Sequence, residues 1–335
     1  MKVCFLYRTK GVSFSIEKVF KQIRSALDKN IEQSDFYCPF NSYKNPLTYI
    51  RNFAALRRKS ADIFHITGAV HYLALFLPAR KTIITVHDLG HAFKTKGIVG
   101  FFLRQLFAIL PLKKAKYIVA ISNFSKNEIV ENVGISPDKI KVIYDPAPIN
   151  LKFKPKSFNF ENPRILCFCH LENKNLDRHI QALKGIKCHL RIIGKLSQKN
   201  IDLLKECGTD YSNDYNISEE QILKEYEDCD MLLFASTYEG FGVPILEAQI
   251  TGRPVVTSNI SPMDEVTGRI LGKDSAISVN PFDIKDIRNG ILKLLDNPRL
   301  AEEIVQKGLE NTQRFSASAI AKQYQDLYER ILKEK

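Results

Sequence analysis

Short apolar segments alternate with longer amphipathic segments along the first half of the chain. Val, Ile and Phe gather in five runs, at 3–7, 63–66, 82–86, 117–121 and 141–143. Apolar residues recur at helical spacing in three stretches between these runs, at 16–27, 47–58 and 124–133. Ser122 and Asn123 precede the last stretch as capping residues. This alternation is typical of repeated strand-helix-strand units and predicts a parallel sheet.

The same alternation starts again in the second half. Its apolar runs lie at 164–168, 190–193, 231–235, 255–257 and 277–279. Residues 144–163 contain four prolines and no sustained period, so we expect the interdomain linker there. The pattern predicts an α/β protein with two doubly wound domains, at 1–150 and 151–335.

Two helices of the second half carry clear signals. Ser218 and Gln221 have the spacing of a capping box before the apolar positions Ile222 and Tyr226. Residues 316–332 have one apolar face, which predicts a long amphipathic helix at the end of the second domain. We expect this last helix to pack back on the first domain.

The composition agrees with a globular protein of about two domains. The 335 residues are 44% hydrophobic and 26% charged, which excludes a disordered or fibrous chain. The seven cysteines follow no repeated spacing and predict no disulfide framework, as expected in a reducing cytosol. The apolar run at 1–7 ends at Arg8 and is too short for the core of a signal peptide.

The positive charge is concentrated in one half. Residues 1–150 contain 23 Lys and Arg against 10 Asp and Glu, whereas residues 151–335 contain 26 against 27. This asymmetry favours either an anionic partner, such as an acidic membrane or a phosphorylated substrate, or a merely solubilising surface. We expect no nucleic acid partner, because no base-reading motif accompanies the charge.

One segment, GIVGFFLRQLFAILPL at 97–112, is apolar over most of its length. It contains Arg104 and is shorter than the ~18 uninterrupted apolar residues that a membrane span needs. It is therefore either a buried or partly exposed helix, which we favour, or a helix along a membrane surface. In the second case Lys113, Lys114 and Lys116 would lie at its end.

Residues 231–259 predict a strand, a loop, a helix and a second strand. Pro244 suits the first turn of the helix, and Gly240 and Gly242 let the preceding backbone approach a ligand closely. A helix that begins at the carboxyl end of a parallel strand favours anions, because unpaired N–H groups point outward there. This segment therefore predicts a nucleotide site.

Glu239 and Glu247 stand eight positions apart in this segment. One carboxylate could accept two hydrogen bonds from a ribose diol, while the other serves a sugar or a developing positive charge. The alternative is structural: Glu247 merely sits near the helix N-terminus and Glu239 is solvated. Spacing alone does not separate the two interpretations.

The stretch E-G-F-G-V-P-I-L-E-A from Glu239, followed by T-G-R-P-V-V-T-S-N, resembles the E-x7-E signature of the retaining glycosyltransferases of family 4. Further resemblances follow in order along the chain: V-H-D-L-G-H from Val86, A-I-S-N-F-S from Ala120, C-H-L-E-N-K-N-L-D-R-H-I from Cys169, and R-I-I-G-K from Arg191. The resemblance implies the GT-B fold, with two Rossmann-like domains that face a central cleft.

The resemblance also implies roles for single residues. Glu247 would bind the nucleotide ribose, Glu239 the donor sugar, and Lys174 the donor diphosphate. The backbone of the turn between the two glutamates would hold sugar hydroxyls and phosphate, namely Phe241, Gly242 and Val243. His87 would approach the donor sugar; without the motif it would be read as a histidine that caps a loop.

The chain departs from the family's pattern in two loops. Cys169, His170 and Asn173 stand where members commonly have Gly, Thr or Arg, and Arg, so we expect Lys195 and Arg178 to help hold the diphosphate. After the first strand only Gly11 remains of a glycine pair that admits phosphate or acceptor, and a simple tight turn explains it almost as well.

We expect neither a cofactor nor a metal. His87, Asp88 and His91 have a spacing that suggests metal ligands. However, this segment leaves a strand and contains Gly90, so a helix would not present the two histidines together. We therefore reject the metal interpretation.

Together these features predict a retaining glycosyltransferase that moves a sugar from a nucleotide-sugar donor to an acceptor hydroxyl. We expect it in cell-surface polysaccharide assembly, O-antigen or capsule-like, on a lipid-linked or glycan acceptor. It would be cytoplasmic and peripheral at the inner face of the membrane, with an anionic membrane surface as a further partner. The alternatives are a catalytically silent subunit that binds nucleotide sugar, which the altered 169–173 loop favours, or an epimerase or phosphorylase of the same fold.

Overall fold

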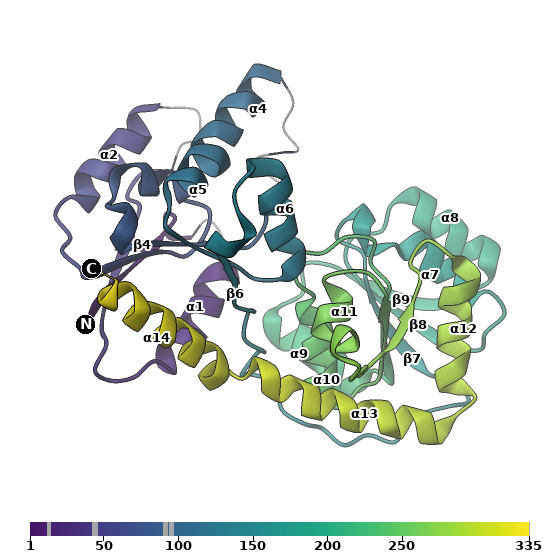
Figure 1. Ribbon diagram of the computed structural model, residues 1–335. Helices are drawn as coiled ribbons and strands as arrows, with labels where there is room; N and C mark the ends of the chain where they lie inside the picture. Colours follow the sequence, from purple (N-terminus) through teal and green to yellow (C-terminus); the bar gives the residue numbers. More distant parts are fainter. Residues whose placement is uncertain (12–14, 42–45, 90–92, 94–96, 335) are drawn as a thin grey trace. The chain divides into compact units, whose positions relative to one another are not determined.

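The computed structural model describes residues 1–11, 15–41, 46–89, 93 and 97–334 (Figure 1). Contacts divide the chain into two units, one made of Met1–Pro146 with Ser316–Lys335 and the other of Ala147–Phe315. The division at 146/147 lies four residues before the predicted boundary at 150/151. The chain from 143 to 163 forms neither helix nor strand.

The first unit is built on a parallel sheet of six strands in the order β2-β1-β3-β4-β5-β6. Its strands are β1 (Lys2–Tyr7), β2 (Glu32–Tyr37), β3 (Ile63–Ile66), β4 (Thr82–Val86), β5 (Tyr117–Ala120) and β6 (Ile140–Val142). Successive strands are added on one side of β1 for β2 and on the other side for β3 to β6, so the strand order reverses between β1 and β3. Doubly wound folds bind ligands at such a point.

The α-helices of the first unit are α1 (Ser15–Ser25), α2 (Pro46–Leu56), α4 (Gly97–Arg104), α5 (Leu110–Lys114), α6 (Asn123–Val133) and α14 (Ala317–Lys333). A π-helical turn, η3 (Gln105–Ile109), joins α4 to α5. Short 3-10 turns are η1 (His71–Phe76), η2 (Ala79–Lys81) and η4 (Pro137–Lys139). Ser122 caps α6 by accepting a hydrogen bond from the Ser125 N–H, as its position predicted.

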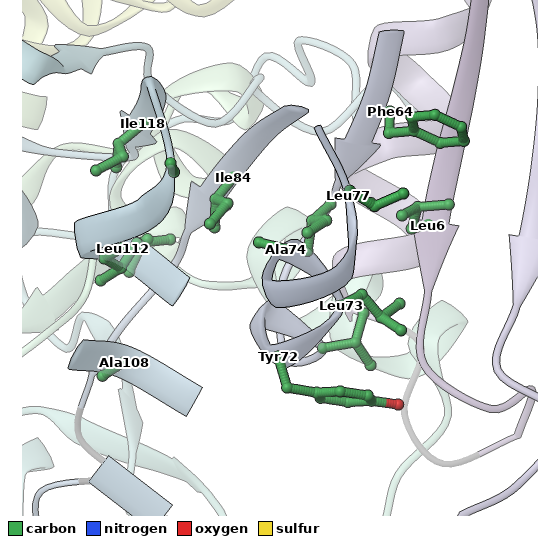
Figure 2. Close-up of a cluster of buried hydrophobic side chains, with 14 of the residues drawn as sticks. Leu6, Phe64, Tyr72, Leu73, Ala74, Leu77, Ile84, Ala108, Leu112 and Ile118 are labelled. Atoms are coloured by element: carbon green, nitrogen blue, oxygen red, sulfur yellow. The ribbon is translucent and has the colours of Figure 1, made fainter. Parts of the chain in front are cut away.

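Apolar side chains cover both faces of the first sheet. Along β1, Cys4 and Leu6 join one buried cluster, whereas Val3 and Phe5 join the other. This is the period of two that a strand imposes. Figure 2 shows residues of the first cluster, with Leu112 near Ile84 and Ile118 of the strands and Ala108 one turn earlier along the helical segment. Burial on both faces explains why these strands read as continuous apolar runs.

The C-terminal helix α14 completes the other cluster. Its Tyr324 and Tyr328 are fully buried. The Tyr328 hydroxyl lies 2.7 Å from Nδ1 of His65, whose Nε2 lies 2.8 Å from the Thr85 hydroxyl. Burial lowers the pKa of His65 to about 3, so the ring stays neutral. The predicted boundary includes this helix in the second domain, with the expectation that it packs back on the first; its contacts make it part of the first unit.

The second unit has its own parallel sheet, in the order β12-β11-β10-β7-β8-β9. Its strands are β7 (Arg164–Phe168), β8 (His189–Ile193), β9 (Asp210–Asp214), β10 (Met231–Phe234), β11 (Val255–Ser258) and β12 (Ile277–Val279). The order reverses between β7 and β10.

The helices of the second unit are η5 (Glu172–Lys174), α7 (Leu176–Leu183), α8 (Gln198–Cys207), α9 (Glu219–Asp228), α10 (Val243–Thr251), α11 (Met263–Val266), η6 (Arg269–Leu271), α12 (Ile284–Leu295), α13 (Pro298–Thr312) and η7 (Gln313–Phe315). Ser218 and Gln221 form the predicted capping box at the start of α9. A buried apolar cluster between α7, α12 and the sheet forms the core.

Each apolar run that the sequence marks as a strand is a strand, and most ends agree within one residue. The strands β2 and β9 were not predicted. Their sequences, EQSDFY and DYSND, are polar, and they lie at the edges of their sheets, where a strand has a neighbour on one side only. The two parallel sheets with their helices confirm the predicted fold class. Among the described residues, no helix has the length and apolar character that a bilayer crossing requires.

Candidate functional site

Two loops of the second unit meet at the carboxyl ends of β7 and β10, where the strand order reverses. The Thr237 N–H donates to the carbonyl of Asn173 at 2.8 Å, and the Asn173 amide donates to the carbonyl of Tyr238 at 2.6 Å. The Asn175 amide donates to the carbonyls of Ala235 and Pro281. These bonds hold the loop after β7 against the loop after β10.

Lys174 and Glu239, which the sequence analysis places at the diphosphate and the sugar, form an ion pair across these loops. Lys174 Nζ lies 2.7 Å from Oε1 of Glu239, and the side chains are 14% and 13% exposed. The same ammonium lies 4.7 Å from the centre of the Phe234 ring. The pair thus places one positive and one negative group at the edge of the sheet, partly shielded from water.

The start of α10 follows directly. Gly242 precedes the helix with φ +125°, a conformation that L side chains rarely adopt, and Pro244 lies in the first turn. Phe241 is buried, and its ring packs edge-on against Phe315 at 5.8 Å. These features fix the turn at the start of α10, where Pro244 has no N–H and the Ile245 N–H donates to the Gly242 carbonyl at 3.0 Å. The structure therefore places Phe241, Gly242 and Val243 at the N-terminus of α10, two to four positions after Glu239.

Glu247 lies one turn into α10, and its carboxylate is hydrogen-bonded to a buried tyrosine. The Tyr226 hydroxyl, from α9, donates to Oε2 of Glu247 at 2.6 Å. Tyr226 is fully buried, and burial together with the Glu247 carboxylate raises its pKa well above the ordinary value, so it remains a donor. Its own carbonyl accepts a hydrogen bond from Nε of the buried Arg253.

The two cations expected to compensate for the altered loop differ in their surroundings. Lys195 is exposed and directly follows Gly194, the first residue after β8, which has φ +133°. A Cβ at Gly194 would lie 2.8 Å from Sγ of Cys169, so this backbone runs close beside the loop after β7. Arg178 instead donates to Oδ1 of Asn175 at 2.8 Å, and its guanidinium lies over the Phe282 ring. Its side chain therefore contacts residues that position the loop after β7.

His87 and Gly11 belong to the first unit. His87 follows β4, and its Nε2 lies 3.0 Å from the carbonyl oxygen of Thr67, while Nδ1 lies 3.5 Å from Oδ2 of Asp145. Burial disfavours the charged ring, but Asp145 and the Thr67 carbonyl outweigh it, so the pKa of His87 is raised. Both ring nitrogens face acceptors, which favours the imidazolium ion.

Gly11 follows β1 with φ +83° and is exposed, with no atom near the position of a Cβ. The positive φ of the turn is sufficient reason for a glycine at this position. The predicted role of Gly11 in binding a ligand stays a prediction. His91 and Gly90, which entered the rejected metal interpretation, lie outside the described residues. Within the described part of the chain, no three His, Cys, Asp or Glu side chains are grouped as metal ligands would be.

The sequence analysis missed Tyr226 and Asp145 as partners of site residues. Tyr226 was read as an apolar position of an amphipathic helix, and Asp145 fell inside the predicted linker. The sequence around Tyr226 and Asp145 does not reveal these contacts, because their partners, Glu247 and His87, lie in separate elements. Asn173 was noted as a departure from the family, and it proves to be one of the residues that join the two loops.

Known protein families and structures match almost the whole chain. The family model "Glycosyl transferases group 1" matches residues 150–311, and "Glycosyltransferase Family 4" matches residues 23–150. The crystal structure of Anabaena Alr3699/HepE in complex with UDP-glucose is similar over 98% of this chain and 100% of that chain, with a TM-score of 0.71 and 16% identity. Together these matches identify the two-unit architecture as the GT-B fold.

Two curated relatives are informative. The serotype-specific mannosyltransferase WbdA of Escherichia coli is 23% identical over 75% of this chain, which spans only 34% of that relative's length. The N,N'-diacetylbacillosaminyl-diphospho-undecaprenol alpha-1,3-N-acetylgalactosaminyltransferase of Campylobacter jejuni is 25% identical over 86% of this chain and 83% of its own length.

Proposed function

This chain belongs to glycosyltransferase family 4, and from that premise we propose that it transfers a sugar from a nucleotide-sugar donor to an acceptor hydroxyl, with retention of the anomeric configuration. The observation that carries the proposal is the arrangement at the strand-order reversal of the second unit. There the Lys174–Glu239 ion pair, the N-terminus of α10 and the Tyr226-bound Glu247 occupy consecutive parts of one sheet edge.

Each of these groups suits one part of a nucleotide sugar. The ammonium of Lys174 and the N–H groups at the start of α10 stabilise the negative charge that grows on the diphosphate as it leaves. Glu239 faces the opposite charge, which grows on the sugar ring as the bond from the anomeric carbon to the phosphate oxygen breaks. The Glu247 carboxylate, with one oxygen held by Tyr226, accepts hydrogen bonds from the ribose diol.

The reaction balances without a further reagent. The acceptor oxygen bonds to the anomeric carbon on the face that the diphosphate leaves, and the acceptor proton passes to the departing phosphate. The products are a glycoside and a nucleoside diphosphate. We propose that no metal is needed, because Lys174 and the backbone amides supply the positive charge.

The acceptor we propose is a lipid-linked glycan of cell-surface polysaccharide assembly, at the inner face of the membrane. The names of two relatives support this choice: the Campylobacter jejuni relative acts on a diphospho-undecaprenol-linked sugar, and the Escherichia coli relative is serotype-specific. The Anabaena neighbour was solved with UDP-glucose, which makes UDP-sugars the first donors to test.

The test is a panel of nucleotide sugars, scored by thermal shift and by slow donor hydrolysis, and then by transfer to polyprenyl-diphosphate-linked sugars. We expect one donor to respond in all three, and the anomeric configuration of the product, read by NMR, to match the donor. A donor that binds but is neither hydrolysed nor transferred would identify a silent binding subunit. Phosphate-dependent cleavage would indicate a phosphorylase, and donor isomerisation an epimerase.

A further inference from the structure

The helix α4 of the first unit carries an exposed apolar face. Four of its side chains are largely open to solvent: Ile98 at 77%, Val99 at 66%, Phe101 at 51% and Phe102 at 65%. The opposite side is packed, because Gly100 in α4, and Ala108 and Leu112 in the continuation through η3 and α5, are buried. Figure 2 shows Ala108 and Leu112 within the core cluster. Single exposed apolar residues are ordinary, but four in five consecutive positions are not.

Positive charge is concentrated in the part of the sequence that contains this face. Between residues 46 and 116 the sequence has twelve Lys and Arg against two Asp and no Glu. Lys113 and Lys114 are exposed at the end of α5. The neighbouring helix α2 and the turn after it carry exposed Arg51, Arg57 and Arg58, and Tyr49 of α2 lies against Phe107 of the π-helical turn at 5.8 Å. The apolar face thus lies in the most basic part of the chain.

These two features together select one kind of partner. A helix with aromatic and aliphatic side chains on one face and cations around it is typical of helices that lie in the interface of a bilayer. A second copy of the chain would bring the same cations together, which charge repulsion opposes.

We infer that α4 docks the first unit on an anionic lipid bilayer, with Ile98, Val99, Phe101 and Phe102 inserted among the acyl chains and the surrounding Lys and Arg at the headgroups. This inference does not depend on the proposed function, because it rests on the first unit alone and requires no donor or acceptor. It combines the two interpretations of the 97–112 segment: the helix packs on one side, as the structure shows, and would meet the membrane on the other.

The chain contains no Trp, so a single Phe102→Trp substitution provides a fluorescent reporter of insertion. The full-length variant is titrated with vesicles of phosphatidylcholine, either pure or mixed with phosphatidylglycerol, across a salt series. We expect a blue shift and quenching by brominated acyl chains with the anionic vesicles. The matched control is Phe153→Trp, a half-exposed aromatic position of the second unit, for which we expect neither effect.

Two further variants separate insertion from attraction, with sedimentation on the same vesicles as the readout. The double variant Phe101→Ser, Phe102→Ser should lower the partition coefficient roughly tenfold or more and leave only salt-sensitive binding. The double variant Lys113→Gln, Lys114→Gln should lower it about fivefold for each cation at low salt. Normal thermal unfolding of each variant shows that the first unit remains folded.

The inference is overturned if Phe102→Trp shows no shift with anionic vesicles at low salt, or if the two tryptophan variants shift equally. It is also overturned if binding is abolished by salt alone and the Phe variants bind as well as the unchanged chain. The Phe102→Trp fluorescence could instead be blue-shifted without vesicles and depend on protein concentration. If light scattering also showed a dimer, the exposed face of α4 would be the contact with a second copy of the chain instead of with a membrane.

Discussion

Removing one hydroxyl, in Tyr226→Phe, tests how Glu247 is held. The bond to Oε2 of Glu247 is 2.6 Å long and involves a fully buried donor and a charged acceptor. Such a charge-assisted bond contributes ~1.5 to 3 kcal/mol, and Phe preserves the shape of the ring. We therefore expect the free energy of unfolding of the second unit to fall by about that amount, measured by denaturant titration.

Donor affinity should fall less than stability. The hydrogen bond from Tyr226 to Glu247 is present with and without donor. In the variant, Glu247 is no longer fixed before the donor binds, so the only loss in affinity is the free energy needed to order its side chain. Ordering one side chain costs about 0.5 to 1.5 kcal/mol, which corresponds to roughly 2- to 12-fold in affinity. Calorimetric titration with the donor found by the panel measures this. The turnover number at saturating donor should be almost unchanged, because Tyr226 positions a binding group.

Tyr324→Phe is the matched control, since it removes a buried hydroxyl, 3.3 Å from the Thr85 hydroxyl, in the first unit. It should lower stability but leave donor affinity unchanged. If Tyr226→Phe lowers stability and leaves affinity unchanged as well, Tyr226 is a purely structural residue. If Glu247→Ala also binds donor normally, the assignment of Glu247 to the ribose is wrong, whatever the role of Tyr226.

Three further predictions concern the remaining site groups. Glu239→Gln should lower turnover by orders of magnitude with the fold intact, and Lys174→Ala should weaken donor binding roughly tenfold or more; normal kinetics in either variant would remove that residue from the site. Activity should survive excess EDTA, and a loss that only Mg²⁺ or Mn²⁺ restores would contradict the proposed metal independence. Because the pKa of His87 is raised from 6.5, its charged form should stabilise the fold fully below pH 6.5 and progressively less as pH rises through the raised value. Asp145→Asn should flatten this dependence in thermal unfolding, and an unchanged profile would show that the His87–Asp145 pair contributes no stability.

The apolar pattern was sufficient for the central strands of both sheets and for the edge strands β6 and β12, but not for the polar edge strands β2 and β9. A central parallel strand is buried on both faces, so its sequence must be apolar, as in MLLF of β10. The edge strand β9 reads DYSND, and what makes it a strand is backbone pairing with β8, which leaves no mark on its side chains. The pattern is informative where burial demands apolar side chains, and it is silent for the polar edge strands β2 and β9.

The candidate site was predictable to the level of segments. The order of strand, glycine-containing turn and proline-started helix located Glu239 in a loop and Glu247 on a helix, as the structure has them. The partners were not predictable, because Tyr226 reaches Glu247 only through the packing of α9 beside α10. Nor did the sequence show that Asn173, read as a weakened grip on diphosphate, bonds the loop after β10.

The place of α14 has a consequence for synthesis on the ribosome. The second unit is one continuous segment, Ala147–Phe315, whereas the first unit needs Ser316–Lys335 to fill its core with Tyr324 and Tyr328. The unit translated first is therefore completed last, and the face of its sheet that α14 will cover stays open to chaperones while the other unit can already fold. Nascent chains stalled before residue 316 should yield a protease-resistant second unit beside a sensitive first one.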